Sequence, residues 1–130
     1  MSNDLYRDLN EQERKILLKM ASAEVINREI LIAQIDVARV NGLDRVGSLK
    51  FKLTQCPQYF NTNGPMITAQ QEDVDTVAGF GPYINVLLFL KDGYIDELEV
   101  YKDDGSEIVS QLDPEKFTLT WGLPPSRRGP

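Results

Sequence analysis

The chain has 130 residues and a formal net charge of −6 at pH 7; 42% of its residues are hydrophobic and 26% are charged. These values are ordinary for a globular protein, so they predict one domain over residues 1–130 and argue against a disordered or membrane protein. One cysteine and no histidine exclude an internal disulfide, histidine-ligated zinc and histidine-dependent nucleophiles. We therefore expect a cytoplasmic protein with no cofactor and no metal site.

Two helices are expected near the N-terminus, after a loose terminus at residues 1–8. Asn10 followed by Glu13 matches a capping box, and an apolar stripe at helical spacing predicts a helix over about 11–21. Ser22 is a candidate cap for a second helix, which would run to about Gln34 with an apolar face of Ile26, Ile30, Ala33 and Leu31. The two helices should form a hairpin that covers one side of a sheet.

From Ile35 the apolar pattern changes to a period of two, which predicts strands. The first would cover residues 35–40 and end at the turn signal Asn41-Gly42. The next would cover residues 49–53, with Lys50 and Lys52 pointing outward. The remaining expected elements are a strand at 66–71, a turn at 72–75, a short helical turn around 108–112, a strand at 117–121 and a loose tail at 122–130.

The central element is a hairpin that turns at Asp92-Gly93, because Asp-Gly supplies the positive φ angles of a two-residue turn. Pairing Lys91 with Tyr94 and counting back predicts a core face and an acidic face. The core face would carry Phe89, Leu87, Leu98 and Val100, and the other face would carry Leu90, Leu88 and Val86 beside Glu97 and Glu99. A bulge at Gly93 would shift the pairing by one residue but keep the alternation within residues 94–101.

The predicted fold is therefore α+β, with two N-terminal helices packed on a mostly antiparallel sheet of five to six strands, whose order the sequence does not determine. Charge is unevenly distributed along it. Residues 1–65 hold nine basic and eight acidic residues, whereas residues 66–115 hold two and twelve. Such an acidic block repels nucleic acid and anionic lipid and attracts basic protein surfaces, although exposed carboxylates also simply promote solubility.

The sequence contains no convincing catalytic residues. Glu97 and Glu99 would project from one strand face about 7 Å apart, a separation that acid–base hydrolysis can use, but a solvated strand face is the plainer interpretation. Asp73 and Asp75 lack the donor spacing of a calcium loop. The larger aromatic residues are interpreted first as core or loop packing and second as interface anchors: Tyr59, Phe60, Phe80, Tyr83 and Trp121.

The hairpin segment Leu-Lys-Asp-Gly-Tyr-Ile-Asp-Glu-Leu-Glu at residues 90–99, with residues 9–18 and 47–51, resembles small bacterial proteins of uncharacterised type. Some of these are similar to immunity proteins against polymorphic toxins, including those of contact-dependent growth inhibition. The resemblance covers about residues 9–108. It implies a cytosolic protein that binds a toxin domain, often a basic nuclease, and blocks its active site or its access to substrate.

The resulting hypothesis is an immunity protein that occludes a basic toxin surface with an acidic face, and binding should weaken with salt and with charge reversal at Glu97 or Glu99. The candidate partner-binding residues are Glu97, Glu99, Asp103, Asp104, Glu107, Glu72, Asp73 and Asp75. Two alternatives stay open: a structural or adaptor homo-oligomer that pairs through a sheet edge or through Val86, Leu88 and Leu90, and a hydrolase that uses Glu97 and Glu99.

Overall fold

The computed structural model describes residues 5–23, 27–60 and 62–121. Helix α1 (Glu11–Ala21) begins at the predicted capping box: the Glu13 amide donates to Asn10 Oδ1 at 2.8 Å, and the Asn10 amide donates to Glu13 Oε1 at 3.0 Å. These two bonds satisfy amide groups that the first helical turn would otherwise leave unpaired. The predicted position of α1 is therefore confirmed.

Helix α2 (Arg28–Val37) begins and ends later than predicted. Its N-cap is Asn27 rather than Ser22, and the predicted apolar residue Ile26 lies outside the described residues. Residues 35–37, expected to begin a strand, complete the helix because Leu31, Gln34 and Ile35 form its buried face.

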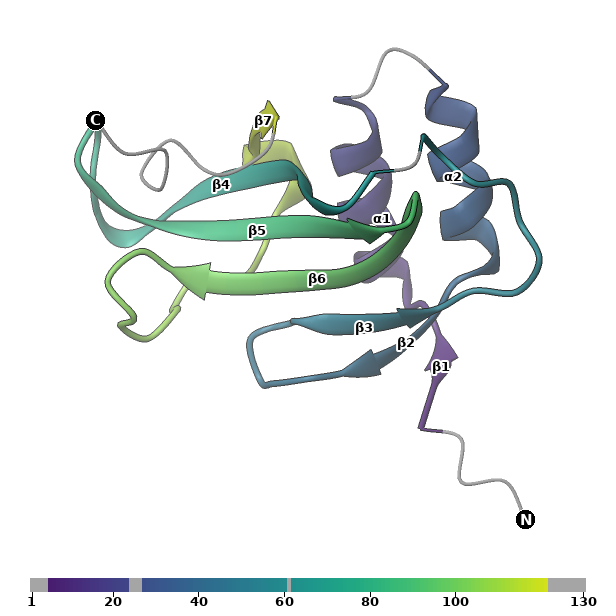
Figure 1. Ribbon diagram of the computed structural model, residues 1–130. Helices are drawn as coiled ribbons and strands as arrows, with labels where there is room; N and C mark the ends of the chain where they lie inside the picture. The colour runs from purple at the N-terminus through teal and green to yellow at the C-terminus, as the bar shows by residue number, and fades with distance from the viewer. Residues whose placement is uncertain (1–4, 24–26, 61, 122–130) are drawn as a thin grey trace.

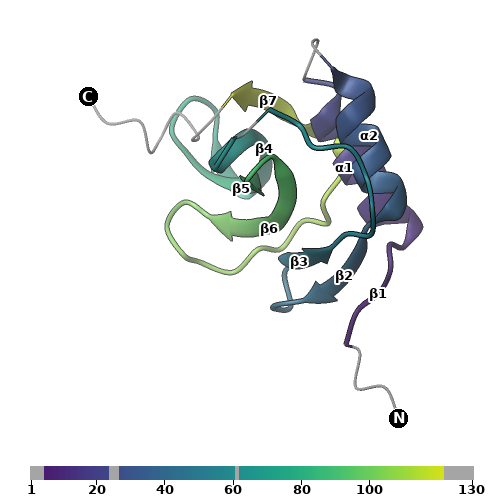
Figure 2. The same ribbon diagram turned by 45° about the vertical axis from the view of Figure 1, so that its right-hand side comes forward.

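The described residues form one antiparallel sheet with the strand order β1-β2-β3-β6-β5-β4-β7. The two helices pack against one face of this sheet, and the core lies between the layers (Figures 1 and 2). The α+β class is thus confirmed, but the described part has seven strands rather than five or six, and β1 precedes the helices. The strands are β1 (Arg7–Asp8), β2 (Arg39–Gly42), β3 (Leu49–Lys52), β4 (Gly64–Val77), β5 (Gly81–Lys91), β6 (Tyr94–Lys102) and β7 (Thr118–Trp121).

Several local predictions need correction. Arg7 and Asp8 pair with β2, so this part of the expected loose terminus is ordered, whereas residues 122–130 lie outside the described part. Asn41-Gly42 lies within β2, and the turn that follows is held by Asp44, whose Oδ1 accepts the amides of residues 46–48. Strand β4 continues through residues 72–75, which were expected to be a turn. A 3-10 turn at Pro114–Lys116 replaces the helical turn expected around 108–112.

The β5–β6 hairpin has the predicted turn but a shifted register. Lys91 pairs with Tyr94 and Leu90 with Ile95, after which Phe89 pairs with Glu97, so Asp96 is an extra residue in β6. This bulge lies at Asp96 rather than Gly93 and moves every later pair by one residue. The helix-facing side therefore carries Leu88 opposite Leu98 and Val86 opposite Val100, and the other side carries Leu87 opposite Glu99.

The shifted register excludes one of the two surfaces considered for a homo-oligomer and leaves the other, the sheet edge, open. Val86, Leu88 and Leu90 are at most 2% exposed and belong to the core under the helices. They are therefore unavailable for pairing with a second copy of the chain. Across the described residues, neither helix is long and apolar enough to cross a bilayer.

Candidate functional site

The long strands β4, β5 and β6 extend past the helices, and the turn between β4 and β5 comes close to the loop after β6 (Figures 1 and 2). We call this end of the sheet the tip and define it as residues 72–83 and 102–110. The tip contains six carboxylates and one ammonium group, a formal charge of −5. Six of the eight candidate partner-binding residues lie there.

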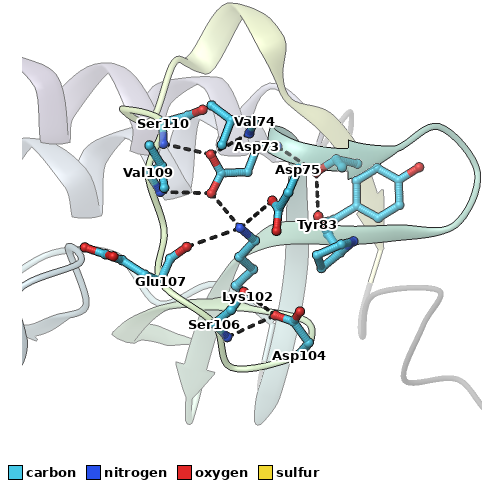
Figure 3. A network of polar contacts seen from close by, with 12 residues as sticks. Asp73, Val74, Asp75, Tyr83, Lys102, Asp104, Ser106, Glu107, Val109 and Ser110 are labelled. Atoms are coloured by element: carbon cyan, nitrogen blue, oxygen red, sulfur yellow. Dashed lines mark hydrogen bonds and ion pairs between the residues drawn. The ribbon is translucent and has the colours of Figure 1, made fainter.

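Lys102 is the only basic residue of the tip, and its side chain is 1% exposed. Alternation along β6 directs it to the same side of the sheet as Leu98 and Val100, so its aliphatic stem continues the core. Its Nζ lies 2.9 Å from Asp73 Oδ2 and 2.6 Å from Asp75 Oδ1, and it donates to the Glu107 carbonyl at 3.2 Å (Figure 3). The one positive charge of the tip is therefore paired with acceptors of the same chain and is not presented at the surface.

Asp73 has a fully buried carboxylate that accepts four hydrogen bonds. Oδ1 accepts the amides of Val74 and Ser110, each at 2.8 Å, and Oδ2 accepts the Val109 amide and the Lys102 ammonium, each at 2.9 Å (Figure 3). Burial alone would raise the pKa of Asp73, but these donors outweigh it and hold the pKa far below its usual range. Asp73 is therefore a structural link between β4 and residues 109–110, and its carboxylate is closed to a partner.

The inward position of Asp73 follows from an irregularity in β4. Glu72 pairs with Tyr83 and Val77 pairs with Gly81, so residues 73–76 oppose a single residue of β5. The extra residues bend β4, so its side chains no longer alternate regularly between the two faces of the sheet. Within the irregular stretch the Asp73 amide donates to Thr76 Oγ1 at 2.8 Å, which replaces a sheet hydrogen bond.

Asp103 and Asp104 stabilise the loop after β6 while keeping their carboxylates at the surface. Asp103 accepts the Tyr83 amide at 2.9 Å and the Asn85 side-chain amide at 2.6 Å. Asp104 accepts the hydroxyl and the amide of Ser106, and these two bonds lower the pKa of Asp104 (Figure 3). The lowered pKa keeps Asp104 anionic at neutral pH.

The structure brings together some of the predicted residues and separates others. Glu72, Asp75, Asp103, Asp104 and Glu107 are exposed at the tip. Glu97 and Glu99 are half-buried on the opposite side of β6 from Lys102, where their cross-strand partners are Phe89 and Leu87. The predicted acidic residues therefore form a tip group and a separate pair on the sheet face that faces away from the helices.

The sequence interpretation took Phe80 first as a packing residue and only second as an interface anchor, and it did not single out the other apolar side chains of the tip. Phe80 is 88% exposed, Val74 72%, Val109 62% and Val77 60%. The available signal was the position of Phe80 between Gly79 and Gly81, which have φ angles of 83° and 88°. A residue between two such glycines lies in a turn, where no neighbouring strand covers its side chain.

Within the described part of the chain, no three Asp, Glu or Cys side chains are grouped so that they could hold a metal ion. In the comparison with known proteins, a family model described as a domain of unknown function, DUF6984, matches residues 6–112. The matched span includes both helices, strands β1 to β6 and the whole tip. No curated protein and no solved structure matches the chain.

Proposed function

The chain belongs to the DUF6984 family, whose description assigns no activity, and we propose that it is a non-enzymatic immunity protein that neutralises a basic toxin domain through its acidic tip. The observation that carries the proposal is the charge of the tip. Five carboxylates are exposed there, and the single ammonium group is buried against Asp73 and Asp75. A partner approaching this end meets negative charge without a compensating surface cation from the tip.

The distribution of charge over the rest of the molecule supports an oriented approach. The first helix carries Arg14, Lys15 and Lys19, and nine of the fourteen basic residues lie within residues 1–65. The two helices together carry four basic and four acidic residues, so the molecule has an acidic tip and a helix layer without net charge. Opposite charges steer association and can raise the rate by about 10- to 1,000-fold at low salt. A basic nuclease, which uses Lys and Arg to hold phosphates, offers a matching surface.

The proposed mechanism is occlusion. The carboxylates of the tip take the place of substrate phosphates on the Lys and Arg side chains of the toxin, so substrate and immunity protein compete for one surface. The resemblance of residues 9–108 to small bacterial proteins, some of which are similar to immunity proteins, favours the same role and a cytosolic place of action. Nucleic acid itself is not a favoured partner, because the tip would repel its phosphates.

The test is binding to the C-terminal domain of a large secreted protein encoded directly upstream, a gene arrangement that strongly favours an immunity role. The two proteins should co-purify in low salt, and the dissociation constant should rise steeply between about 50 and 200 mM salt, where screening of exposed charges grows. Absence of such a neighbour, or of binding at low salt, contradicts the proposed function. Tight binding that ignores salt would contradict the charge mechanism alone.

A further inference from the structure

Apolar side chains are concentrated at the tip. Among the described residues there are eight exposed large hydrophobic side chains, and four of them lie at the tip: Val74, Val77, Phe80 and Val109. The remaining four lie elsewhere along the chain, at positions 5, 43, 46 and 60. Apolar side chains ringed by charged residues are typical of the centre and the rim of a protein interface.

The contacts around these residues hold their backbone in place. The amides of Val74 and Val109 donate to the same carboxylate, that of Asp73, which places the two residues on either side of it (Figure 3). In the β4–β5 turn, the Phe80 amide donates to the Val77 carbonyl at 2.9 Å, and the Gly79 amide donates to the Tyr83 hydroxyl at 2.8 Å. A surface that is already ordered loses less conformational entropy when a partner binds it.

Charge decides which partner fits these apolar residues. A second copy of the chain docking tip to tip would bring two groups of charge −5 together, and like charges facing each other oppose association. An anionic membrane surface is repelled for the same reason. A protein with an apolar hollow bordered by Lys and Arg satisfies both features of the tip.

We infer that Phe80, supported by Val74, Val77 and Val109, is the apolar anchor of the interface, and that it inserts into a hollow bordered by basic side chains on the toxin domain. This inference rests on the proposed function and assigns association and dissociation to different residues of the tip. The exposed carboxylates set the rate of association and its salt dependence. Phe80 sets the lifetime of the complex, because an aromatic side chain withdrawn from water must be re-exposed on dissociation.

The experiment compares Phe80→Ser with Phe60→Ser, in association and dissociation kinetics with the upstream-encoded toxin domain. Phe60 is a suitable control because it is also exposed, at 56%, and lies outside the tip. Phe80→Ser should raise the dissociation rate by about tenfold or more and leave the salt dependence of association unchanged, since hot-spot truncations have effects of this size. Phe60→Ser should change the dissociation rate by less than about twofold, the range of peripheral contacts.

The outcomes separate this inference from the proposed function. If the wild-type chain binds with the expected salt dependence but Phe80→Ser dissociates like the wild type, Phe80 does not anchor the interface, whereas the proposed immunity function is not contradicted. If the wild-type chain does not bind the domain at low salt, the proposed function and the anchor fall together. Thermal unfolding of both variants shows whether each is folded, and a fully exposed serine in place of Phe80 is expected to leave the midpoint within a few degrees of the wild type.

Discussion

Lys102 is charged in a position that water does not reach. Two carboxylates and one carbonyl contact its ammonium group, and the Asp73 carboxylate is equally buried. Removing one member of a buried pair leaves the other charge without compensation, which is more destabilising than the pair is stabilising. The individual residues of this network therefore determine whether the tip keeps its shape.

We expect Asp73→Asn to lower the free energy of unfolding by about 3 kcal/mol, and Asp75→Asn by less than about 1 kcal/mol. Both oxygens of Asp73 accept from donors, so the NH₂ group of asparagine would face two N–H groups whichever way the amide is turned. The Asp75 side chain is 50% exposed and can turn to water. Denaturant titration measures both effects, and equal effects would mean that the burial of Asp73 has no energetic weight.

The same carboxylate gives a pH dependence of known sign. Because the pKa of Asp73 is lower in the folded state, its contribution to stability is present above the unfolded-state pKa, about 3.9, and is lost as the pH falls toward the folded-state pKa. The difference in unfolding free energy between wild type and Asp73→Asn should therefore be constant from pH 7 to about 5 and shrink below about pH 4. Denaturation at a series of pH values measures it; a difference that grows on acidification would contradict the assignment.

At the scale of elements, the β5–β6 turn is fixed by residues that are distant in sequence. Gln34 of α2 donates to the carbonyls of Gly93 and Pro57, each at 2.9 Å, and accepts the Ile95 amide at 2.9 Å. Gly93 also exchanges backbone hydrogen bonds with Tyr59 and Thr62. The helix layer, the hairpin turn and the segment before β4 therefore meet at one buried point.

Gly93→Ala should be about 2 kcal/mol more destabilising than Gly105→Ala. Both glycines have positive φ angles, 81° and 74°, so alanine is strained at either position. Only at Gly93 would the added Cβ also lie 2.4 Å from the Tyr59 carbonyl oxygen and 2.6 Å from that of Phe60, and backbone yields little to such a clash. Thermal or denaturant unfolding of the two variants measures the difference. Equal decreases in the free energy of unfolding would show that the packing of Gly93 against residues 59 and 60 does not restrict the turn.

Local sequence signals predicted elements well where the structural cause is local. The capping box at Asn10 and Glu13 fixed the start of α1, and alternation fixed β3, with Leu49 and Phe51 buried. The register of the β5–β6 hairpin was wrong because the prediction assumed unbroken alternation over residues 94–101, whereas the bulge at Asp96 interrupts it: Ile95 and Leu98, three residues apart, are both buried. The spacing of the apolar residues Ile95, Leu98 and Val100, three and then two, was the sequence signal of this extra residue.

The candidate site shows the same division between local and long-range causes. The acidic character of the tip was evident in the sequence. Its carboxylates come together only because the β4–β5 turn and the end of β6 lie at the same end of the sheet, and no local sequence pattern predicts that arrangement. Asp73 was assigned to an exposed edge because its donors, the Val109 and Ser110 amides, lie 36 and 37 residues away. Lys102, the only basic residue of the tip, was the one sequence signal that a carboxylate is needed inside.

At the scale of the whole molecule, the account depends on where negative charge acts and not on its total amount. Net charge alone favours solubility, and a protein of charge −6 attracts any cation weakly. A docking function requires that one surface matter more than others of equal charge. Three acidic surfaces permit that comparison: the tip, the sheet-face pair Glu97 and Glu99, and the first turns of the helices, which carry Glu11 and Glu29.

The most direct test is the association rate of three double variants with the upstream-encoded toxin domain at low and moderate salt. The variants are Glu72→Lys with Glu107→Lys, Glu97→Lys with Glu99→Lys, and Glu11→Lys with Glu29→Lys, which change net charge equally. The account predicts that the tip variant associates about tenfold more slowly at low salt and loses most of its salt dependence, with a smaller effect on the sheet face and almost none at the helices. A tip variant that associates like wild type, while either other variant is slowed, would contradict it.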